Sequence, residues 1–265
     1  MSLDASLAAE VPGLLRYARA ITRDPHRAED LVQATLVRAL ERRESFRGDA
    51  ALATWLHRIL HNLAVDAARR DREEPSDAVA DAVERSWHDD AYTVDAASVV
   101  ERAETAEELR DALVHLPFIY RAAVVLHDAE GMTAAQVADI QGIGLPAAKQ
   151  RLRRGRMMLV SELARGHERR EALAGVPLRC WVARGQVSGY LDGELPRGDR
   201  VAVERHLEGC PTCPPLYTAL VGTRAALGAV RDPDSVVPPS TAARIQRIVD
   251  GVGGGLVRPT PPPRN

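Results

Sequence analysis

The chain has 265 residues, enough for one large domain or about two to three small ones with hydrophobic cores. Hydrophobic residues make up 45% of the sequence and aromatic residues 4%, and no run approaches the roughly 18 consecutive apolar residues that a membrane span requires. These values exclude a membrane-spanning class and disfavour a β-sandwich, so we expect a soluble protein with no membrane partner.

The formal net charge of −2 conceals a strong asymmetry along the chain. Residues 71–111 contain 14 acidic residues against four arginines, whereas residues 145–170 contain eight basic residues against two glutamates. A nearly neutral chain can therefore still carry a segment that binds nucleic acid. The first twenty residues lack the basic start and apolar core of a secretory signal, which predicts a cytoplasmic location.

Residues 1–70 are predicted to form a compact helical domain, because apolar residues recur at three- to four-residue spacing in successive stretches. Residues 71–100 are acidic, contain Pro75 and are poor in periodic apolar positions, so we expect a flexible linker with little fixed structure. The periodic positions of the first domain are Leu14, Leu15, Ala18 and Ile21, then Leu31, Leu36 and Leu40, and then Trp55, Leu56, Ile59, Leu60 and Leu63.

A second helical domain is predicted over residues 101–170. Thr133 is an expected N-cap, and Gln136 three residues later is its partner in a capping box. The helix that starts there should end at Gly142, and Pro146 suits the first turn of the next helix. Two helices joined by a short turn that contains glycine, the second rich in arginine, are typical of a helix-turn-helix.

The second helix of this motif carries Lys149, Gln150, Arg153 and Arg154 at spacings that place them on one outward face. Lysine and arginine can bind guanine in the major groove, and glutamine can bind adenine, while further arginines neutralise phosphates. A solvated charged face is the alternative. The capping box and the turn before this helix favour DNA binding.

The third unit is predicted over residues 177–251 and contains every cysteine of the chain. Cys180, His206, Cys210 and Cys213 follow the pattern C-x25-H-x3-C-x2-C, and the last three lie within a helical turn and the turn after it. Four such ligands suit a closed tetrahedral Zn²⁺ site with one ion per chain. The alternative is three small buried hydrophobic residues beside a surface histidine.

A catalytic zinc would need an open coordination position and a nearby general base, and nothing in the sequence indicates either. We therefore expect a structural or regulatory metal site in a protein that is not an enzyme. The end of the chain, residues 252–265, is rich in glycine and proline and is predicted to be a disordered tail.

Four segments of the first domain resemble region 2 of extracytoplasmic-function sigma factors: RAEDLVQ at 27–33, FRGD at 46–49, TWLHRI at 54–59 and NLAVD at 62–66. The helix-turn-helix from Thr133 to Leu163 resembles region 4 of the same family and follows in the expected order. The resemblance implies an all-α fold with a region 2 bundle and a region 4 helix-turn-helix. It also implies promoter-directed transcription initiation with core RNA polymerase and promoter DNA as partners.

The resemblance implies a role for each candidate residue. Asp30, Leu31 and Gln33 would bind the clamp of the polymerase β′ subunit, and the β subunit is a further expected contact. One departure stands in the second helix, where Pro146-Ala147-Ala148 replaces the Gly-Thr-Val of many members and removes a threonine expected to contact phosphate. Asn62, Asp66, Arg69 and Arg70, with the loop at 46–54, would bind the melted minus-ten element, and Lys149, Gln150, Arg153 and Arg154 would bind the minus-thirty-five element.

The third unit resembles the zinc-containing anti-sigma domains through YLDGEL at 190–195 and ERHLEGCPTC at 204–213. Because such domains are usually separate proteins, their fusion here implies regulation in cis through a contact between the zinc domain and the sigma domains. The apolar stretches at 216–221 and 245–249 are candidates for that contact.

Two other functions fit parts of the sequence. A stand-alone helix-turn-helix regulator with a zinc or redox-sensing domain would bind duplex DNA without polymerase. A zinc hydrolase would need a base such as Glu204 or Glu208 beside an incompletely ligated ion. Initiation with core polymerase separates the first alternative from a sigma factor.

Overall fold

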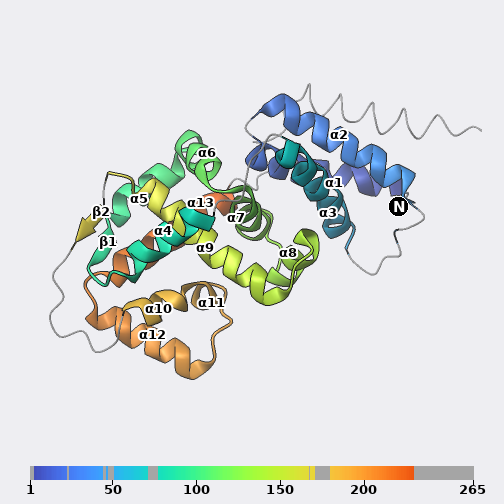
Figure 1. Cartoon of the computed structure of the whole chain (residues 1–265). Helices are drawn as coiled ribbons and strands as arrows, with labels where there is room; N and C mark the ends of the chain where they lie inside the picture. The colour runs from blue at the N-terminus through green and yellow to red at the C-terminus, as the bar shows by residue number, and fades with distance from the viewer. Residues whose placement is uncertain are drawn as a thin grey trace, which may run out of the picture. The chain divides into compact units, whose positions relative to one another are not determined.

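The computed structural model describes residues 3–22, 24–43, 46, 51–70, 77–166, 168–170 and 180–229. These residues are almost entirely helical, which confirms the all-α prediction (Figure 1). They fall into two compact units, one made of residues up to Ala64 and the other of residues from Val65 onward. Within the described ranges, no helix is both long enough and apolar enough to cross a membrane.

The first unit contains α1 (Leu3–Ile21), α2 (Pro25–Glu41) and most of α3 (Leu52–Arg70). Helix α2 begins where its sequence dictates, because the Asp24 side chain accepts a hydrogen bond from the backbone N–H of His26 at 2.8 Å and Pro25 occupies the first turn. The apolar positions predicted from periodicity form much of its core, including Leu14, Leu15, Leu36, Leu56 and Leu60.

Two histidines of α3 are buried in this core. The ring of His61 is hydrogen-bonded through Nδ1 to the hydroxyl of Tyr17 at 2.8 Å. The Nδ1–H of His57 donates to the carbonyl oxygen of Ala53 at 2.8 Å. Burial is the largest influence on His57 and lowers its pKa to about 4, although the hydrogen bond to Ala53 opposes this shift. His57 is therefore neutral in the folded protein at pH 7.

The second unit begins with the end of α3 and runs through α4 (Asp77–His88), strand β1 (Tyr92–Val94), α5 (Ala96–Glu104), α6 (Ala106–His115) and α7 (Phe118–Val124). A short π-helical turn, η2 (Val125–Ala129), leads to α8 (Ala134–Gln141), α9 (Leu145–Leu163) and strand β2 (Glu168–Arg170). The remaining elements are α10 (Cys180–Gly185), α11 (Val187–Leu191), α12 (Arg197–Gly209) and α13 (Cys213–Ala229). The two strands pair antiparallel, with Tyr92 opposite Arg170.

Helix α9 is the central element of this unit and contacts α4, α5, α6, α7, α8, α11 and α13. Its approach to α7 requires a glycine, because a Cβ at Gly155 would lie 2.6 Å from Cγ2 of Val124 and 3.0 Å from the carbonyl oxygen of Tyr120. The buried residues of α9 are Ala148, Leu152, Gly155, Arg156, Met157, Met158, Leu159, Val160 and Leu163.

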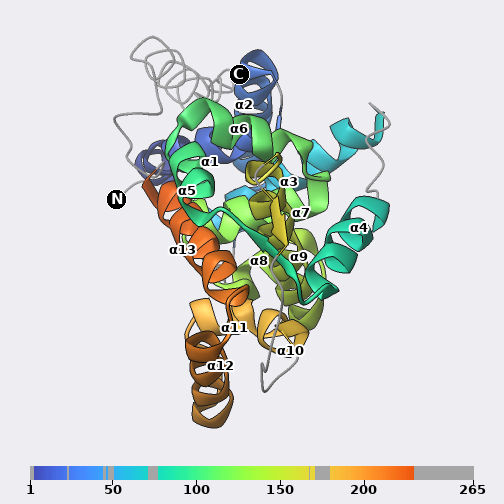
Figure 2. The same ribbon diagram turned by 90° about the vertical axis from the view of Figure 1, so that its left-hand side faces the viewer.

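The C-terminal helix α13 packs directly on the helices of the second domain. It contacts α5, η2, α9 and β1, and Figure 2 shows it running beside α5. The approach to α5 is close, because a Cβ at Gly222 would lie 2.4 Å from Cγ2 of Val100. Leu216, Leu220 and Leu227 are buried in this contact region. The segments expected at 101–170 and 177–251 thus share one core over their described residues.

The prediction of little fixed structure at residues 71–100 is wrong for the part that the structure describes. Residues 77–100 form α4, β1 and the first half of α5. Trp87 anchors this segment with no exposed surface, and the acidic side chains of α4 pair with arginines of α9, which offsets their mutual repulsion. Residues 71–76, the predicted tail at 252–265 and the apolar stretch at 245–249 lie outside the described residues.

The buried imidazole of His57 predicts a pH dependence of stability. Between about pH 6.5 and pH 4, histidine in the unfolded chain takes up a proton that folded His57 does not. The free energy of unfolding of the first unit should therefore be fully retained above pH 6.5. It should fall by on the order of 3 kcal/mol as the pH drops to about 4.

Urea unfolding of the full chain across this range, with the His57→Gln variant beside the wild type, measures this contribution. The variant lacks the titrating ring and should lose that part of the pH dependence, whereas His26→Gln, on an exposed position of α2, should retain it. An NMR titration in which His57 protonates near pH 6.5 in the folded protein would contradict the prediction.

Candidate functional site

The helix-turn-helix predicted from local sequence is present in α8 and α9. The hydroxyl of Thr133 accepts a hydrogen bond from the backbone N–H of Gln136 at 3.2 Å, and the Gln136 side chain accepts one from the backbone N–H of Thr133 at 2.8 Å. Gly142 ends α8 with a φ of 64°, a left-handed conformation that favours glycine, and Pro146 lies in the first turn of α9. The capping box and both helix boundaries are confirmed.

The predicted DNA-binding residues of α9 are not equally accessible. Lys149 and Gln150 are exposed, and the ammonium group of Lys149 lies 2.7 Å from a carboxylate oxygen of Glu194. The side chains of Arg153 and Arg154 are only 17% and 19% exposed. The structure thus brings the four residues together on one helix, but other parts of the chain cover two of them.

The covering groups come from α4 and α10. Glu84 pairs with both Arg153 and Arg154, and its distance to the Arg154 guanidinium is 2.7 Å. Asp81 lies 3.5 Å from the same guanidinium. The Arg153 guanidinium also lies 5.3 Å from the centre of the Trp181 ring, within cation–π range. The part of the predicted reading face formed by Arg153 and Arg154 is therefore occupied by the chain's own carboxylates and an aromatic ring.

A third arginine of α9, Arg156, was not among the predicted site residues. Its guanidinium is 4% exposed and donates to Asp128 at 2.6 and 2.9 Å, to Asp192 at 3.0 Å and to Ser188 at 3.1 Å. The sequence carries a signal for it, because Arg156 follows Ala148 and Leu152 at four-residue spacing and so falls on the buried stripe of α9. A charge in that position requires buried partners.

The buried carboxylate of Asp128 remains ionised because of these contacts. Burial alone raises its pKa, but hydrogen bonds from Arg156 and His127 more than offset burial and lower the pKa to about 2. Arg156 in turn has a raised pKa, because Asp128 and Asp192 outweigh the effect of its own burial. Arg156 and Asp128 are therefore a charged pair inside the second unit.

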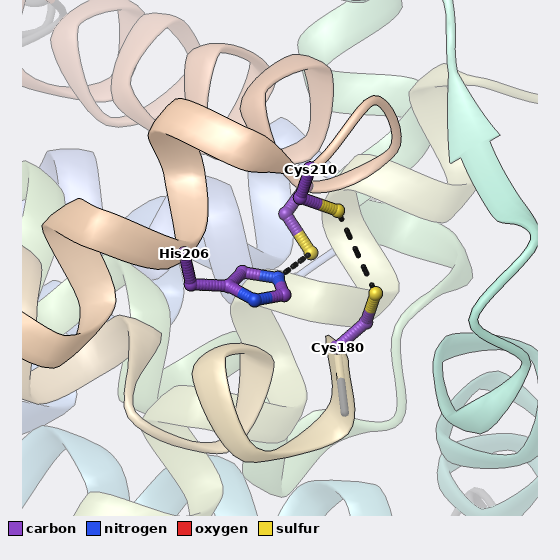
Figure 3. Close-up of side chains that lie close together, drawn as sticks. Cys180, His206 and Cys210 are labelled. Atoms are coloured by element: carbon purple, nitrogen blue, oxygen red, sulfur yellow. Dashed lines mark hydrogen bonds between the residues drawn. The ribbon is translucent and has the colours of Figure 1, made fainter. Parts of the chain in front are cut away.

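The four predicted metal ligands converge in one buried cluster. Cys180 begins α10, His206 lies on α12, Cys210 follows the end of α12 and Cys213 begins α13. Their ligand atoms all lie within 4.8 Å of one another. The Cys180 and Cys210 sulfurs are 3.6 Å apart, and Nε2 of His206 is 3.2 Å from the Cys213 sulfur. Figure 3 shows the side chains of Cys180, His206 and Cys210 pointing toward one another.

This cluster fits a metal ion on its own geometry. A tetrahedral ion with bonds to sulfur of about 2.3 Å separates its sulfur ligands by about 3.8 Å, close to the distance between Cys180 and Cys210. All three cysteines are free thiols. Burial lowers the pKa of His206, which favours the neutral imidazole that binds metals. Three sulfurs and one nitrogen complete a four-coordinate shell, the pattern of a structural site.

Burial in this cluster also changes the pKa values of the cysteine thiols. It is the largest influence on Cys213 and raises its pKa to about 12, and it also raises the pKa of Cys180. Hydrogen bonds from Thr212 and neighbouring backbone offset burial at Cys210 and lower its pKa. A metal ion bound by all three thiolates must therefore displace protons from the cluster.

A buried arginine that sequence reasoning missed connects the cluster to the end of α4. The Nε–H of Arg184 donates to the Cys213 sulfur at 3.4 Å. Its two terminal nitrogens donate to the carbonyl oxygens of Trp87 and Tyr92, each at 2.8 Å. The carbonyl of Asp89 is a further acceptor at 2.9 Å. No local pattern around Arg184 indicates this role, since its partners are backbone oxygens more than ninety residues away.

The predicted site residues of the first domain lie on α2 and α3. Asp30 is exposed on α2, and Leu31 and Gln33 are half-buried there. Asn62 and Asp66 are exposed on α3. Arg69 and Arg70 end α3, but their side chains are outside the described part, as are residues 47–50 of the predicted loop. Their binding roles stay predictions.

Comparison with protein families finds three matches in chain order. Residues 7–74 match the family described as "Sigma-70 region 2", and residues 106–159 match "Sigma-70, region 4". Residues 182–213 match a family described as "Putative zinc-finger". The last match begins just after Cys180 and includes the other three residues of the cluster.

Two similar proteins are extracytoplasmic-function (ECF) RNA polymerase sigma factors. SigM of Mycobacterium tuberculosis is 35% identical over 146 residues, which cover 55% of this chain and 69% of SigM. EcfG of Rhodopseudomonas palustris is 35% identical over 162 residues, which cover 60% of this chain and 83% of EcfG. A solved structure of the sigma factor RpoE with the anti-sigma factor NepR from Bartonella quintana matches at 24% identity and a TM-score of 0.46. It covers 61% of this chain and 95% of that one.

Proposed function

The chain belongs to the ECF sigma factors of RNA polymerase, and we propose that its C-terminal Cys/His domain restrains the promoter-reading helix α9 in cis. As a sigma factor it is a transcription initiation factor that directs RNA polymerase to promoters. The sequence resemblances to regions 2 and 4 and to a zinc domain are confirmed by the family matches.

We assign polymerase binding to α2 and promoter binding to α3 and α9. Asp30, Leu31 and Gln33 would contact the β′ clamp, with β as a further contact of the sigma domains. Exposure of Asp30, Asn62 and Asp66 within the region 2 match supports these roles. Asn62, Asp66, Arg69 and Arg70 would bind the minus-ten element, and Lys149, Gln150, Arg153 and Arg154 the minus-thirty-five element.

The observation that carries the restraint is the docking of the C-terminal elements on region 4. Asp192, just after α11, shares the buried guanidinium of Arg156 with Asp128, and Glu194 pairs with Lys149. Helix α13 covers α5 and η2. Because the domain is covalently attached, its effective concentration is on the order of millimolar, so even weak contacts are largely occupied.

We further propose that the metal is Zn²⁺, one ion per chain, in a structural role. Cys180, His206, Cys210 and Cys213 would hold it, and the ion would cross-link α10, α12 and the start of α13 as a structural tetrahedral centre. This cross-link closes the segment that contains Asp192 and Glu194. It would thereby keep both carboxylates in position against α9.

Initiation tests the sigma function directly. The full chain with core polymerase should produce specific transcript starts on genomic DNA, and Gln150→Ala should weaken use of those promoters by about 1–3 kcal/mol if it removes a base contact. Gln150 suits this test because it is exposed on α9. Arg200→Ala on α12 is the control and should leave promoter choice unchanged. Binding to duplex DNA without any polymerase-dependent start would instead indicate a stand-alone regulator.

Elemental analysis tests the zinc assignment. Chain purified without chelator should hold about one Zn²⁺, and Cys210→Ser or His206→Ala should reduce the content to near zero. Hydrogen exchange should then become faster in α10 and α12, which depend on the cross-link. The exposed histidine of α6 offers a control, since His115→Ala should keep its zinc. A wild-type zinc content near zero would contradict the assignment.

A substitution where α13 closely approaches α5 tests whether the C-terminal domain restrains α9. Gly222→Ala places a methyl group against Val100, so it should weaken the docking of α13 by about 1–3 kcal/mol and increase promoter-dependent transcription by the full chain. Gly228→Ala is a matched control on the same helix, because its Cβ would meet no atom within 4 Å. Equal or lower transcription by Gly222→Ala, despite reduced stability, would show that the domain supports initiation.

A further inference from the structure

Helix α4 connects the two sigma regions and covers α9 with acidic side chains. Asp81 and Glu84 lie on the face of α4 that meets Arg153 and Arg154. Glu84 contacts both guanidinium groups and is itself only 14% exposed. These two arginines are among the residues assigned to the promoter, so α4 and the promoter duplex need the same groups.

A carboxylate is a chemical substitute for the acceptors that α9 would meet on DNA. Guanidinium groups bind carboxylates and phosphates through similar charge-assisted hydrogen bonds, and they bind the acceptor edge of guanine in the same way. While Glu84 occupies Arg153 and Arg154, neither can bind DNA. The acidic character of this segment, noted in the sequence, thus has a specific target.

The ion pairs between α4 and α9 are more exposed than the buried ion pair of Arg156 and Asp128. Asp81 is 51% exposed, so water and salt screen its contact with Arg154, while Glu84 at 14% and the arginines at 17% and 19% lie closer to solvent than the pair of Arg156 and Asp128. Arg156 and Asp128 are 4% and 1% exposed, and separating them would leave an uncompensated buried charge. The first set can be exchanged for DNA phosphates at moderate cost, whereas the second cannot.

The C-terminal end of α4 is held by the Cys/His domain. The indole N–H of Trp87 donates to the hydroxyl of Ser161 on α9 at 3.1 Å. The backbone carbonyl of Trp87 accepts a hydrogen bond from Arg184 on α10. The His88 ring stacks on Trp181 of α10 with ring centres 3.4 Å apart. Trp181 in turn lies beside Arg153. Helix α4 is therefore fixed against α9 by contacts from the domain that holds the metal ligands.

We propose that α4 is an intramolecular DNA mimic that competes with the promoter duplex for Arg153 and Arg154, held in place by Arg184 and Trp181. The proposal rests on the assignment of α9 as the promoter-reading helix. It extends the restraint in cis to the segment between the sigma regions, whose release from α9 is a necessary step of DNA binding.

Duplex binding by the full chain without polymerase tests the mimic. Glu84→Gln removes the charge with little change of shape, and it should tighten binding to a labelled short duplex of random sequence by about tenfold at low salt. The salt dependence of log affinity should become steeper by roughly 0.9 for each arginine released. The control is Glu101→Gln on an exposed position of α5, which makes the same change in net charge away from α9.

Two further measurements identify the mechanism. The gain from Glu84→Gln should vanish when Arg153→Ala and Arg154→Ala are already present, because the mimic has no other target. Hydrogen exchange of α4 amides in the wild-type chain should become faster when duplex is added. Equal duplex affinity of wild type and Glu84→Gln, a gain equal to that of Glu101→Gln, or unchanged exchange in α4 would each overturn the proposal.

These results are separable from those that test initiation. Tighter duplex binding by Glu84→Gln, in a chain that never directs polymerase, would support the mimic and refute the sigma function. Polymerase-dependent starts with no effect of Glu84→Gln on duplex affinity would support the sigma function and refute the mimic.

Discussion

The second unit depends on one buried guanidinium. Arg156 is satisfied only when Asp128 from the π-helical turn before α8 and Asp192 from the C-terminal domain are both in place. Removing Asp128 takes away the most buried counter-charge of Arg156, and removing Asp192 leaves guanidinium donors without acceptors; either loss costs more than losing an exposed pair. The low pKa of Asp128 reflects the same interaction. A helix of region 4 has thus become a helix of a larger core, and the C-terminal domain supplies part of that core.

The polar and basic side chains of α9 become more exposed toward the start of the helix, and this difference in burial separates the residue that stabilises the fold from those that we assign to the promoter. Arg156 faces the interior and holds the unit together. One turn earlier, Arg153 and Arg154 lie at the boundary between core and solvent, where they pair with carboxylates of α4. Lys149 and Gln150 reach solvent at the start of the helix. A single helix can therefore dock firmly through Arg156 and still keep exposed polar side chains near its start.

The Cys/His cluster and α4 are connected through Arg184. This side chain reaches from the Cys213 sulfur to the carbonyl oxygens of Trp87 in α4 and Tyr92 in β1, which flank the turn between these elements. Thr93 adds a hydrogen bond to the carbonyl of Thr212 at 2.8 Å. Because carbonyl oxygens are fixed by the backbone, the cluster cannot shift without disturbing that turn. The Cys/His cluster thus positions both α4 and the carboxylates that face α9.

The sequence by itself determined the features that depend on neighbouring residues. The capping box of Thr133 and Gln136, the helix end at Gly142 and the helix start at Pro146 follow from local hydrogen bonding and backbone sterics, and so they were predictable. The spacing of Cys180, His206, Cys210 and Cys213 likewise indicated one cluster, and the structure brings these four residues together.

Only the tertiary structure decided that residues 77–100 fold into helix and strand. It also decided which buried groups Arg156 and Arg184 bind. Glu84 meets Arg153 across 69 positions, and Arg184 meets the carbonyl of Trp87 across 97. An acidic segment repels itself in isolation, and it folds here because distant arginines neutralise its carboxylates and its own Trp87 is buried against the rest of the unit.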